Sequence, residues 1–436
     1  MKETKRIWTT EVTYHVGKRV CLAGWLHHLR ALKQVSFLIL RDGKGTMQIV
    51  VEDPQLIEQL TQLQRESVLV VEGQVVANPQ APGGVEIQHP SITVVSSTNT
   101  PPPIELFRPT IKAHLPTILD HAPVALRHPC WRERHRISAA SMHGFRKALE
   151  QRDFVEIQTP KIVGAATEGG ANVFEINYFG KSAYLSQSPQ LYKQVMVGVF
   201  ERVFEVGPVF RAELHDTSRH SNEYVSLDVE FGFIHNHITI MHLLTEVLRE
   251  MILAIRERVA QSVALLQANI PEVPQEIPTI HFTEAQELIT QATGENLQNE
   301  PDLAPAHERW LGAWAQREYS SDFLFVTGYP MVKRPFYTHP DPLQPLYSNS
   351  FDLLFRGLEL VTGGQRLHQH ADYMVAIQER GMKAELLEWY LEAFKHGMPP
   401  HGGFAIGLER WVSRLLEISN IRETTLFPRD QTRLVP

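Results

Sequence analysis

The sequence predicts an α+β protein in which strands and helices are distributed over two regions. Residues 1–100 contain short β-rich runs separated by turns, whereas residues 126–436 alternate amphipathic helices with strands. Strands that cluster between well-separated helices favour an antiparallel sheet over regular βαβ units. The chain has 436 residues, 43% of them hydrophobic and 21% charged, so it can bury large cores and is neither disordered nor fibrous.

Charge and cysteine content narrow the class of protein. The two cysteines, Cys21 and Cys130, lie far apart, so we expect neither a disulfide framework nor a cysteine-rich zinc site. No apolar run is long enough for a membrane span, and the mixed charges of the amino end do not resemble a secretory signal. These features predict a cytoplasmic enzyme. The net charge is −7, so a nucleic acid would have to bind to a local basic surface.

Five β-rich runs with one helix between the third and the fourth predict a small barrel of the OB type. The runs cover residues 20–26, 36–40, 46–51, 67–76 and 85–88, and the helix covers residues 53–66. Consecutive prolines at 101–103 hold the chain near an extended polyproline conformation. We therefore expect a barrel domain over residues 1–100, a proline-rich connector over 101–125 and a larger domain over 126–436.

Arginines in the larger domain suggest a nucleotide site without a glycine-rich phosphate loop. Neither GxxxxGK[ST] nor GxGxxG after a strand occurs in the chain. Arginine is the other common solution, because its planar fork pairs bidentately with phosphate or carboxylate. Two strand-like segments bring arginines next to acids: residues 210–224, with FRAE and then RHSNE, and residues 402–410, GGFAIGLER. A single such arginine is more simply explained as a surface ion pair.

Taken together, these two segments resemble motifs 2 and 3 of the class II aminoacyl-tRNA synthetases. Motif 1 would be the helix that ends near residues 154–160, whose Pro160 would lie at the dimer interface of that family. The resemblance spans essentially the whole chain, with the barrel in the place of an anticodon-binding domain. It implies an aminoacyl-tRNA ligase that acts as a homodimer and uses ATP with Mg²⁺.

Residues 186–194, SQSPQLYKQ, resemble the substrate strand of the aspartyl-tRNA synthetases, and the absence of a long insertion between motifs 2 and 3 resembles their compact, archaeal-type form. An aspartate side chain brings a full negative charge that must be paired when it leaves water. We assign Lys193 and Arg366 as a buried pair of cations that waits for this carboxylate. Asparagine would leave both cations facing a neutral amide, at a cost of roughly 3 kcal/mol or more.

The resemblance implies roles for further residues. The residues expected to hold aspartate are Glu168, Gln190, Lys193, Arg211, Asp228, Thr362 and Arg366. Those expected to hold ATP are Arg211, Glu213, Arg219, His220, Glu359, Gly407 and Arg410. Mg²⁺ is expected at Glu359 and Thr362, and catalysis is expected to depend on Arg211, Glu359 and Arg410. The implied reaction needs no side-chain nucleophile, because positioning and charge neutralisation carry it.

The barrel is expected to read the anticodon. By resemblance, Phe37 stacks on the central uridine, Gln48 bonds to it and Arg30 meets a backbone phosphate, although strand alternation alone leaves open which face Phe37 occupies. His28 after Gly-Trp-Leu-His, and Pro82 in a later turn, resemble the form of the enzyme that accepts both aspartate and asparagine tRNAs. The expected partners are therefore tRNA(Asp), tRNA(Asn), L-aspartate, ATP and an aspartyl-tRNA amidotransferase.

Several alternatives remain open at this point. A discriminating aspartyl-tRNA synthetase and an asparaginyl-tRNA synthetase share most of these motifs. A non-catalytic RNA-binding paralogue tends to lose the motif arginines or the metal-binding acid, whereas Arg211, Glu359 and Arg410 are present here. An amidating enzyme built on the catalytic domain alone should lack the barrel. No function is predicted for residues 267–305.

Overall fold

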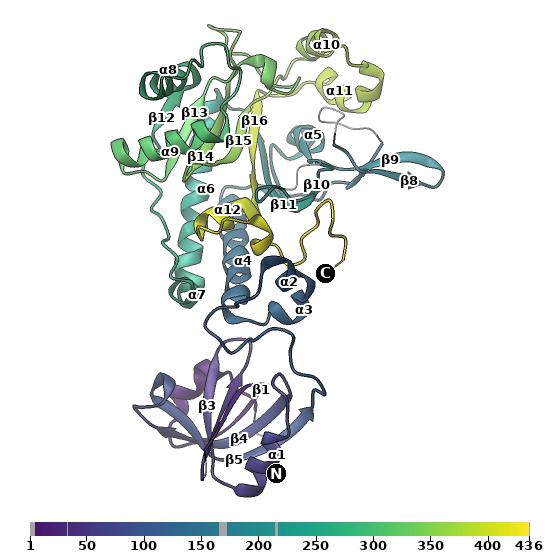
Figure 1. Ribbon diagram of the computed structural model, residues 1–436. Helices are drawn as coiled ribbons and strands as arrows, with labels where there is room; N and C mark the ends of the chain where they lie inside the picture. The colour runs from purple at the N-terminus through teal and green to yellow at the C-terminus, as the bar shows by residue number, and fades with distance from the viewer. Residues whose placement is uncertain (1–4, 33, 165–171, 214–216, 436) are drawn as a thin grey trace. The chain divides into compact units, whose positions relative to one another are not determined.

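The protein is described by a computed structural model that covers residues 5–32, 34–164, 172–213 and 217–435. The chain divides into two compact units, Met1–Pro129 and Cys130–Pro436, and each unit has its own hydrophobic core (Figure 1). Both helices and sheets occur, which confirms the α+β class. Within the described residues, no helix combines the length and the apolar character needed to cross a membrane.

The described part of the first unit contains a closed barrel with strand order β1-β2-β3-β5-β4, as predicted. Its strands are β1 (Arg19–Ala31), β2 (Ser36–Arg41), β3 (Thr46–Val51), β4 (Val68–Ala77) and β5 (Val85–Ser96). Helix α1 (Pro54–Thr61) lies between β3 and β4 and is shorter than expected. It begins sharply because the Asp53 side chain accepts a hydrogen bond from the Gln55 N–H and proline occupies the first turn.

Strand alternation resolves the face occupied by Phe37. On β2, Leu38 and Leu40 are fully buried in the barrel core, whereas Phe37 and Ile39 are only half-buried. Because successive side chains of a strand point to opposite faces, Phe37 lies on the outer face of the barrel.

The connector is more structured than its prolines suggest. It contains the short helices α2 (Leu115–Asp120) and α3 (Ala122–Ala125), which the sequence did not predict. Ile104 and Leu106 are buried, so the segment before these helices is packed and not only extended. An ion cluster ties the chain just after α3 to the barrel: the buried Glu66 accepts hydrogen bonds from the buried Arg41 at 2.7 Å and from the exposed Arg127 at 3.1 Å.

The described residues of the second unit form an eight-stranded sheet with the order β12-β13-β14-β15-β16-β11-β10-β6. Its interior pairs are antiparallel, as predicted, and only the two edge pairs, β10 with β6 and β12 with β13, are parallel. The strands are β6 (Val155–Glu156), β10 (Arg202–Phe210), β11 (Glu223–Gly232), β12 (Thr279–His281), β13 (Phe323–Thr327), β14 (Ser350–Phe355), β15 (Glu359–Gln365) and β16 (His401–Gly407). A small second sheet contains β7 (Ile162–Val163), β9 (Lys181–Leu185) and β8 (Glu175–Tyr178).

The helices of this unit are α4 (Pro129–Glu150), α5 (Gln190–Phe200), α6 (His237–Arg258), α7 (Ala260–Leu266), α8 (Phe282–Thr293), α9 (Pro305–Tyr319), α10 (His370–Glu379), α11 (Glu388–Lys395) and α12 (Leu408–Leu415). The helix predicted over 238–266 is divided at Val259 into α6 and α7. The secondary structure predicted for residues 190–194 was wrong. The segment QLYKQ, expected as a strand, forms the start of α5, because its unbranched side chains favour a helix once Pro189 has turned the chain.

The sheet separates a hydrophobic core from a polar face. On β11, Leu227, Val229 and Phe231 belong to the core formed with α4, α6 and α12. The alternate residues Asp228 and Glu230 are also buried but point to the opposite face. One strand therefore supplies both the core and the floor of a polar site.

Candidate active site

A pocket of about 410 Å³ lies over the polar face of the large sheet. The predicted site residues that line it are Gln190, Arg211, Glu213, Arg219, His220, Glu359, Thr362, Arg366, Gly407 and Arg410. Two further predicted residues, Lys193 and Asp228, are buried and do not line it. Glu168 lies outside the described residues. The fold thus gathers predicted residues from four separated segments (190, 211–220, 359–366 and 407–410) around one cavity.

The segment after β10 contributes a cationic wall. The Arg211 guanidinium lies 5.5 Å from the centre of the Tyr224 ring and 3.9 Å from a Glu213 carboxylate oxygen. His220 Nε2 lies 3.6 Å from the other Glu213 oxygen, and its Nδ1 is 2.6 Å from the Thr217 hydroxyl. These loose contacts leave partly exposed charged groups at the pocket surface, where they can pair with a ligand.

Motif 3 places its arginine against the facing strand. Gly407 ends β16 and caps α12, so Arg410 lies in the first turn of the helix and donates to the Glu359 backbone oxygen at 2.9 Å. Its neighbour Glu409 is buried and accepts hydrogen bonds at 3.1 Å from the Val225 N–H with both carboxylate oxygens. Burial raises the pKa of Glu409 to about 7. Motif 3 is thereby fastened to β11.

Two acids and a hydroxyl form a hard-oxygen site in the first half of β15 and on the neighbouring β14. The Thr362 hydroxyl donates to Glu359 Oε1 at 2.8 Å, and Asp352 is the register partner of Thr362 on β14. Burial and the charge of Glu359 raise the pKa of Asp352 to about 7, although Arg334, 3.0 Å away, opposes this. Two neighbouring carboxylates favour a bound cation, and oxygen ligands suit Mg²⁺. The predicted residues therefore fit this ion, with Asp352 as an addition.

Protein side chains alone would not complete such a metal shell. Within the described ranges, no group of three or more His, Cys, Asp or Glu side chains is placed to hold a metal. Mg²⁺ commonly keeps waters and uses substrate phosphates as ligands, so a site with few protein ligands is consistent with it.

Lys193 lies in the first turns of α5 and is only 1% exposed. Its Nζ is 3.0 Å from Asp228 Oδ1 and 3.3 Å from Glu230 Oε2. It also donates to the backbone oxygens of Val229 and Phe404. The three N–H bonds of the ammonium thus have acceptors within the protein.

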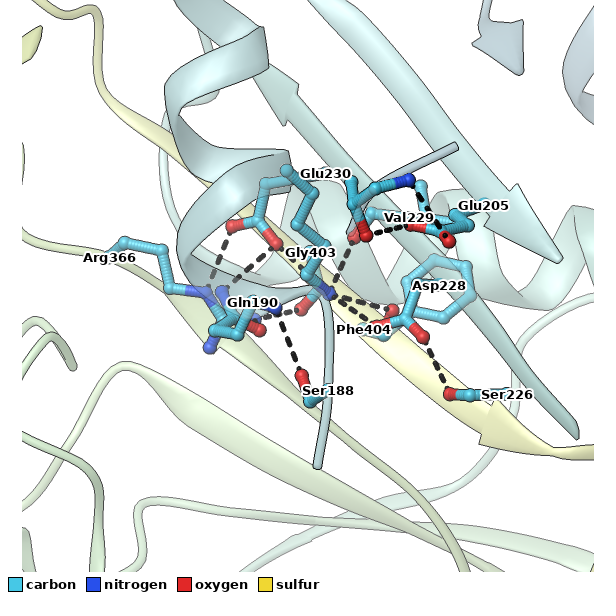
Figure 2. Close-up of polar contacts among 12 residues, drawn as sticks. Ser188, Gln190, Glu205, Ser226, Asp228, Val229, Glu230, Arg366, Gly403 and Phe404 are labelled. Carbon is cyan, nitrogen blue, oxygen red and sulfur yellow. Dashed lines mark hydrogen bonds and ion pairs between the residues drawn. The ribbon is translucent and has the colours of Figure 1, made fainter. Parts of the chain in front are cut away.

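Arg366 lines the pocket and pairs with Glu230, the same acid that Lys193 contacts. Its Nε donates to Glu230 Oε1 at 2.9 Å, and one Nη2 hydrogen bond goes to the Gly403 backbone oxygen at 3.1 Å (Figure 2). Gln190 Oε1 lies 3.5 Å from the same nitrogen. Nη1 has no hydrogen-bond partner among the described residues, and Arg366 lines the pocket. A ligand carboxylate can therefore reach one edge of this guanidinium.

These contacts correct the expectation that two unpaired cations wait for a ligand. Lys193 and Arg366 are buried, as predicted, but two carboxylates, Asp228 and Glu230, balance their formal charges. The physical reason is that an unpaired ammonium in the interior costs several kcal/mol, so the fold supplies its own counter-charges. Arg366 lines the pocket and can contact a ligand directly, whereas the buried Lys193 can contribute only its charge.

Small residues on β16 make room for this cluster. Gly403 pairs with Glu230 across the strands, and a Cβ on Gly403 would lie 1.9 Å from the Val229 backbone oxygen and 2.5 Å from Glu230 Oε2. Only glycine allows the buried carboxylate and β16 to approach so closely.

On the barrel, three predicted anticodon residues share its outer surface. Arg30 is exposed and is the register partner of Phe37 across β1 and β2, so a cation stands beside an outward-facing ring. The Gln48 amide nitrogen donates at 3.0 Å to Glu86, which also accepts from Asn78. Burial raises the pKa of Glu86, but these amide donors and Gln88 outweigh it and leave that pKa below its usual value. Glu86 stays charged and fixes the Gln48 amide.

The other two predicted anticodon residues lie in different elements of the barrel unit. His28 lies near the end of β1 and its ring stacks on Phe107 of the connector. Pro82 is exposed at the start of a 3-10 turn, Pro82–Gly84, between β4 and β5.

The sequence reasoning missed several residues of the site, namely Tyr224, Glu230, Arg334, Asp352, Glu409 and, on the barrel, Glu86. For Glu230 a signal existed, because Ser226, Asp228 and Glu230 alternate with apolar residues on one strand. Asp352 had the same signal, as the single acid in the apolar run of β14. Nothing in the sequence singles out Arg334, which reaches the site from a loop.

Comparisons with known proteins agree with this geometry. Residues 115–431 match the family of class II tRNA synthetases for D, K and N, and residues 20–95 match the OB-fold nucleic acid binding domain. An aspartate–tRNA(Asp/Asn) ligase of Thermus thermophilus is 45% identical over 99% of this chain and 100% of its own length. One of Deinococcus radiodurans is 45% identical over 99% of both chains.

Solved structures resemble the fold of this chain. The asparaginyl-tRNA synthetase of Pyrococcus horikoshii, in complex with asparaginyl-adenylate, has a TM-score of 0.92 and 32% identity, with 100% of each chain covered. The motifs, the pocket that they surround and the whole-length matches lead to one conclusion: the chain belongs to the class II aminoacyl-tRNA synthetases, in the group for aspartate, lysine and asparagine.

Proposed function

We propose that the protein is an ATP-dependent aspartyl-tRNA synthetase that aspartylates tRNA(Asp) and also tRNA(Asn). The observation that carries the proposal is one pocket in which Arg211, Glu359 and Arg410 surround the space for ATP while Arg366 closes its inner wall. Whole-length relatives with this activity support the assignment. A carboxylate side chain fits the wall, because Nη1 of Arg366 can donate a charge-assisted hydrogen bond to it.

The geometry assigns a role to each group in amino-acid activation. Arg211, partly exposed beside Tyr224, would orient the α-carboxylate of aspartate toward the α-phosphate of ATP. Gln190, which lines the pocket, would contact the α-ammonium, and the buried Asp228 beneath it would add a negative charge. Attack by the carboxylate oxygen on phosphorus forms the aspartyl-adenylate, and pyrophosphate leaves toward Arg410. A mobile base is not needed, because the nucleophile is already an anion.

Further parts of the proposal concern the metal and the partners. Glu359 and Thr362, with Asp352 behind them, would hold Mg²⁺, which supplies positive charge against the triphosphate when bound. We propose a homodimer, because exposed apolar side chains, Val155 and Ile162, flank the motif 1 segment. Acceptance of tRNA(Asn) implies a cytoplasmic amidotransferase partner that converts its aspartyl group.

The decisive experiment compares charging of purified tRNA(Asp) and tRNA(Asn) with labelled aspartate. We expect aspartylation of both, and aspartate-dependent ATP–pyrophosphate exchange without tRNA. Aspartylation of tRNA(Asp) alone would reduce the proposal to the discriminating enzyme. Failure to form aspartyl-adenylate would overturn the assignment altogether.

One alternative has specific structural support. Because Lys193 is already paired with two acids, the pocket rejects a neutral amide less strongly than two unpaired cations would. An asparaginyl-tRNA synthetase is therefore the second candidate. Asparagine-dependent exchange exceeding the aspartate-dependent rate in the same assay would favour it.

A further inference from the structure

The orientation of His28 begins with a bulge in β1. Leu26 pairs with Leu40 across the strands, but His28 pairs with Ile39, so His27 is an extra residue on β1. In a regular strand, Leu26 and His28 would share a face, and Leu26 is buried in the barrel core. The bulge turns His28 outward, away from that core.

A ring from the connector receives His28 on the outside. The His28 and Phe107 ring centres are 5.1 Å apart and the rings are 8° from parallel. The Arg65 guanidinium lies 3.9 Å from the centre of the Phe107 ring, and that of Arg108 lies 5.0 Å away. Neither nitrogen of His28 has a hydrogen-bond partner among the described residues, and Nδ1 is buried. Ring stacking, in place of hydrogen bonds, therefore fixes the orientation of the His28 ring.

The members of this stack are fixed by the backbone. Leu26 exchanges hydrogen bonds of 2.8 Å with Glu66 and Ser67, which places the neighbouring Arg65 alongside β1. The Thr98 hydroxyl donates to the Arg65 backbone oxygen at 3.2 Å. On the connector, Ile104 and Leu106 are buried on the amino-terminal side of Phe107. Barrel and connector thus hold the stack together from both sides.

Burial and two nearby arginines keep the stacked imidazole of His28 neutral. Partial burial, Arg65 and Arg30 lower the pKa of His28, so the ring carries no charge at pH 7. By codon pairing, the third anticodon base is cytosine in tRNA(Asp) and uracil in tRNA(Asn). A neutral imidazole can both donate and accept hydrogen bonds, so it can bond to the edge of either base. Without the stack, the His28 side chain would rotate freely, and ordering it against the base would cost rotamer entropy.

We propose that Phe107, supported by Arg65, is a positioning residue that holds His28 for contact with the third anticodon base, and so sets the relative use of tRNA(Asn) and tRNA(Asp). The inference rests on the proposed function, and adds to it that the connector takes part in tRNA choice. Phe107 acts through His28 and need not touch the tRNA.

The test is Phe107→Leu, which keeps an apolar side chain but removes the stacking face, with Phe107→Tyr as the conservative variant. Aromatic stacking is worth ~0.5–1.5 kcal/mol, so kcat/KM for tRNA(Asn) relative to tRNA(Asp) should fall roughly three- to tenfold in Phe107→Leu. Phe107→Tyr should restore the ratio. Tyr14→Leu, at an exposed aromatic of the same unit, is the matched control. ATP–pyrophosphate exchange should stay unchanged in all three variants.

A double-mutant cycle shows whether the effect passes through His28. In a His28→Gln background, Phe107→Leu should change the tRNA ratio no further, because the positioned ring is gone. Additive losses, equal losses on both tRNAs, or no change in the ratio would each overturn the proposal.

Failure of the proposed function gives a different result. If the unmodified protein aspartylates only tRNA(Asp), dual acceptance is wrong, and the stack is then measured on tRNA(Asp) transcripts with cytosine or uracil at the third anticodon position. Phe107→Leu should alter that preference, and an unaltered preference would overturn the positioning role.

Discussion

Arg366 illustrates how a single side chain divides its hydrogen bonds between the fold and the ligand. Nε and Nη2 are engaged by Glu230 and Gly403, and the remaining edge faces the pocket. Arginine is suited to this position because its planar fork offers donors in two directions at once. Lysine at the same position would have one nitrogen for both tasks.

Arg366→Lys should therefore raise KM for aspartate by roughly tenfold or more, since one lost charged hydrogen bond is worth about 1.5–3 kcal/mol. KM for ATP should change little. The measurement is ATP–pyrophosphate exchange at varied aspartate and ATP, and Arg317→Lys on the exposed face of α9 is the control. An unchanged KM for aspartate would show that Arg366 does not contact the substrate.

Glu409 should make stability depend on pH. Its pKa is about 7 in the folded protein, because of burial, against an ordinary value of 4.5. The folded state thus binds a proton more tightly, and this contribution is complete below pH 4.5 and is lost as the pH rises through 7. In the unmodified protein, Glu409 should lower the free energy of unfolding by about 3 kcal/mol between pH 5 and pH 8. Glu409→Gln should remove this decline.

Urea unfolding followed by tryptophan fluorescence at several pH values measures this effect, because Trp411 is buried on the same helix. Equal slopes of stability against pH in the two proteins would contradict the prediction.

At the scale of elements, β11 and β16 unite the core and the site. Their alternate residues face either the packed helices α4 and α6 or the buried ion cluster. A change that moves one strand relative to the other therefore disturbs packing and chemistry together.

Gly403→Ala should disturb both the packing and the site, because the added Cβ would lie 1.9 Å from the Val229 backbone oxygen. Such overpacking costs roughly 1–3 kcal/mol or more, and displacement of Glu230 should raise KM for aspartate as well. Gly164→Ala, where an added Cβ meets nothing within 4 Å, is the control. Thermal unfolding and exchange kinetics give the two readouts. A Gly403→Ala protein with the stability and kinetics of the control would contradict the prediction.

At the scale of the whole molecule, the net charge of −7 opposes tRNA binding, so local cations must supply the attraction. Exposed Arg30 on the barrel is one of them. Small substrates, in contrast, meet buried or half-buried charges that salt screens less.

Raising salt from 50 to 200 mM should therefore raise KM for tRNA at least roughly tenfold, while ATP–pyrophosphate exchange changes by less than about twofold. Both are measured on the same enzyme preparation, with potassium chloride as the salt. Parallel loss of the two activities would point to a salt effect on folding.

The sequence alone determined the fold class, the barrel in front and the motif residues of the pocket, because strand periodicity, glycine-rich turns and short ordered motifs are local signals. Only the tertiary structure decided how the charges are shared. That Lys193 is saturated by Asp228 and Glu230, and that Arg366 keeps one free edge, follows from distances between segments far apart in the chain. The stack of His28 on Phe107 is likewise a contact between β1 and the connector, which no local pattern encodes.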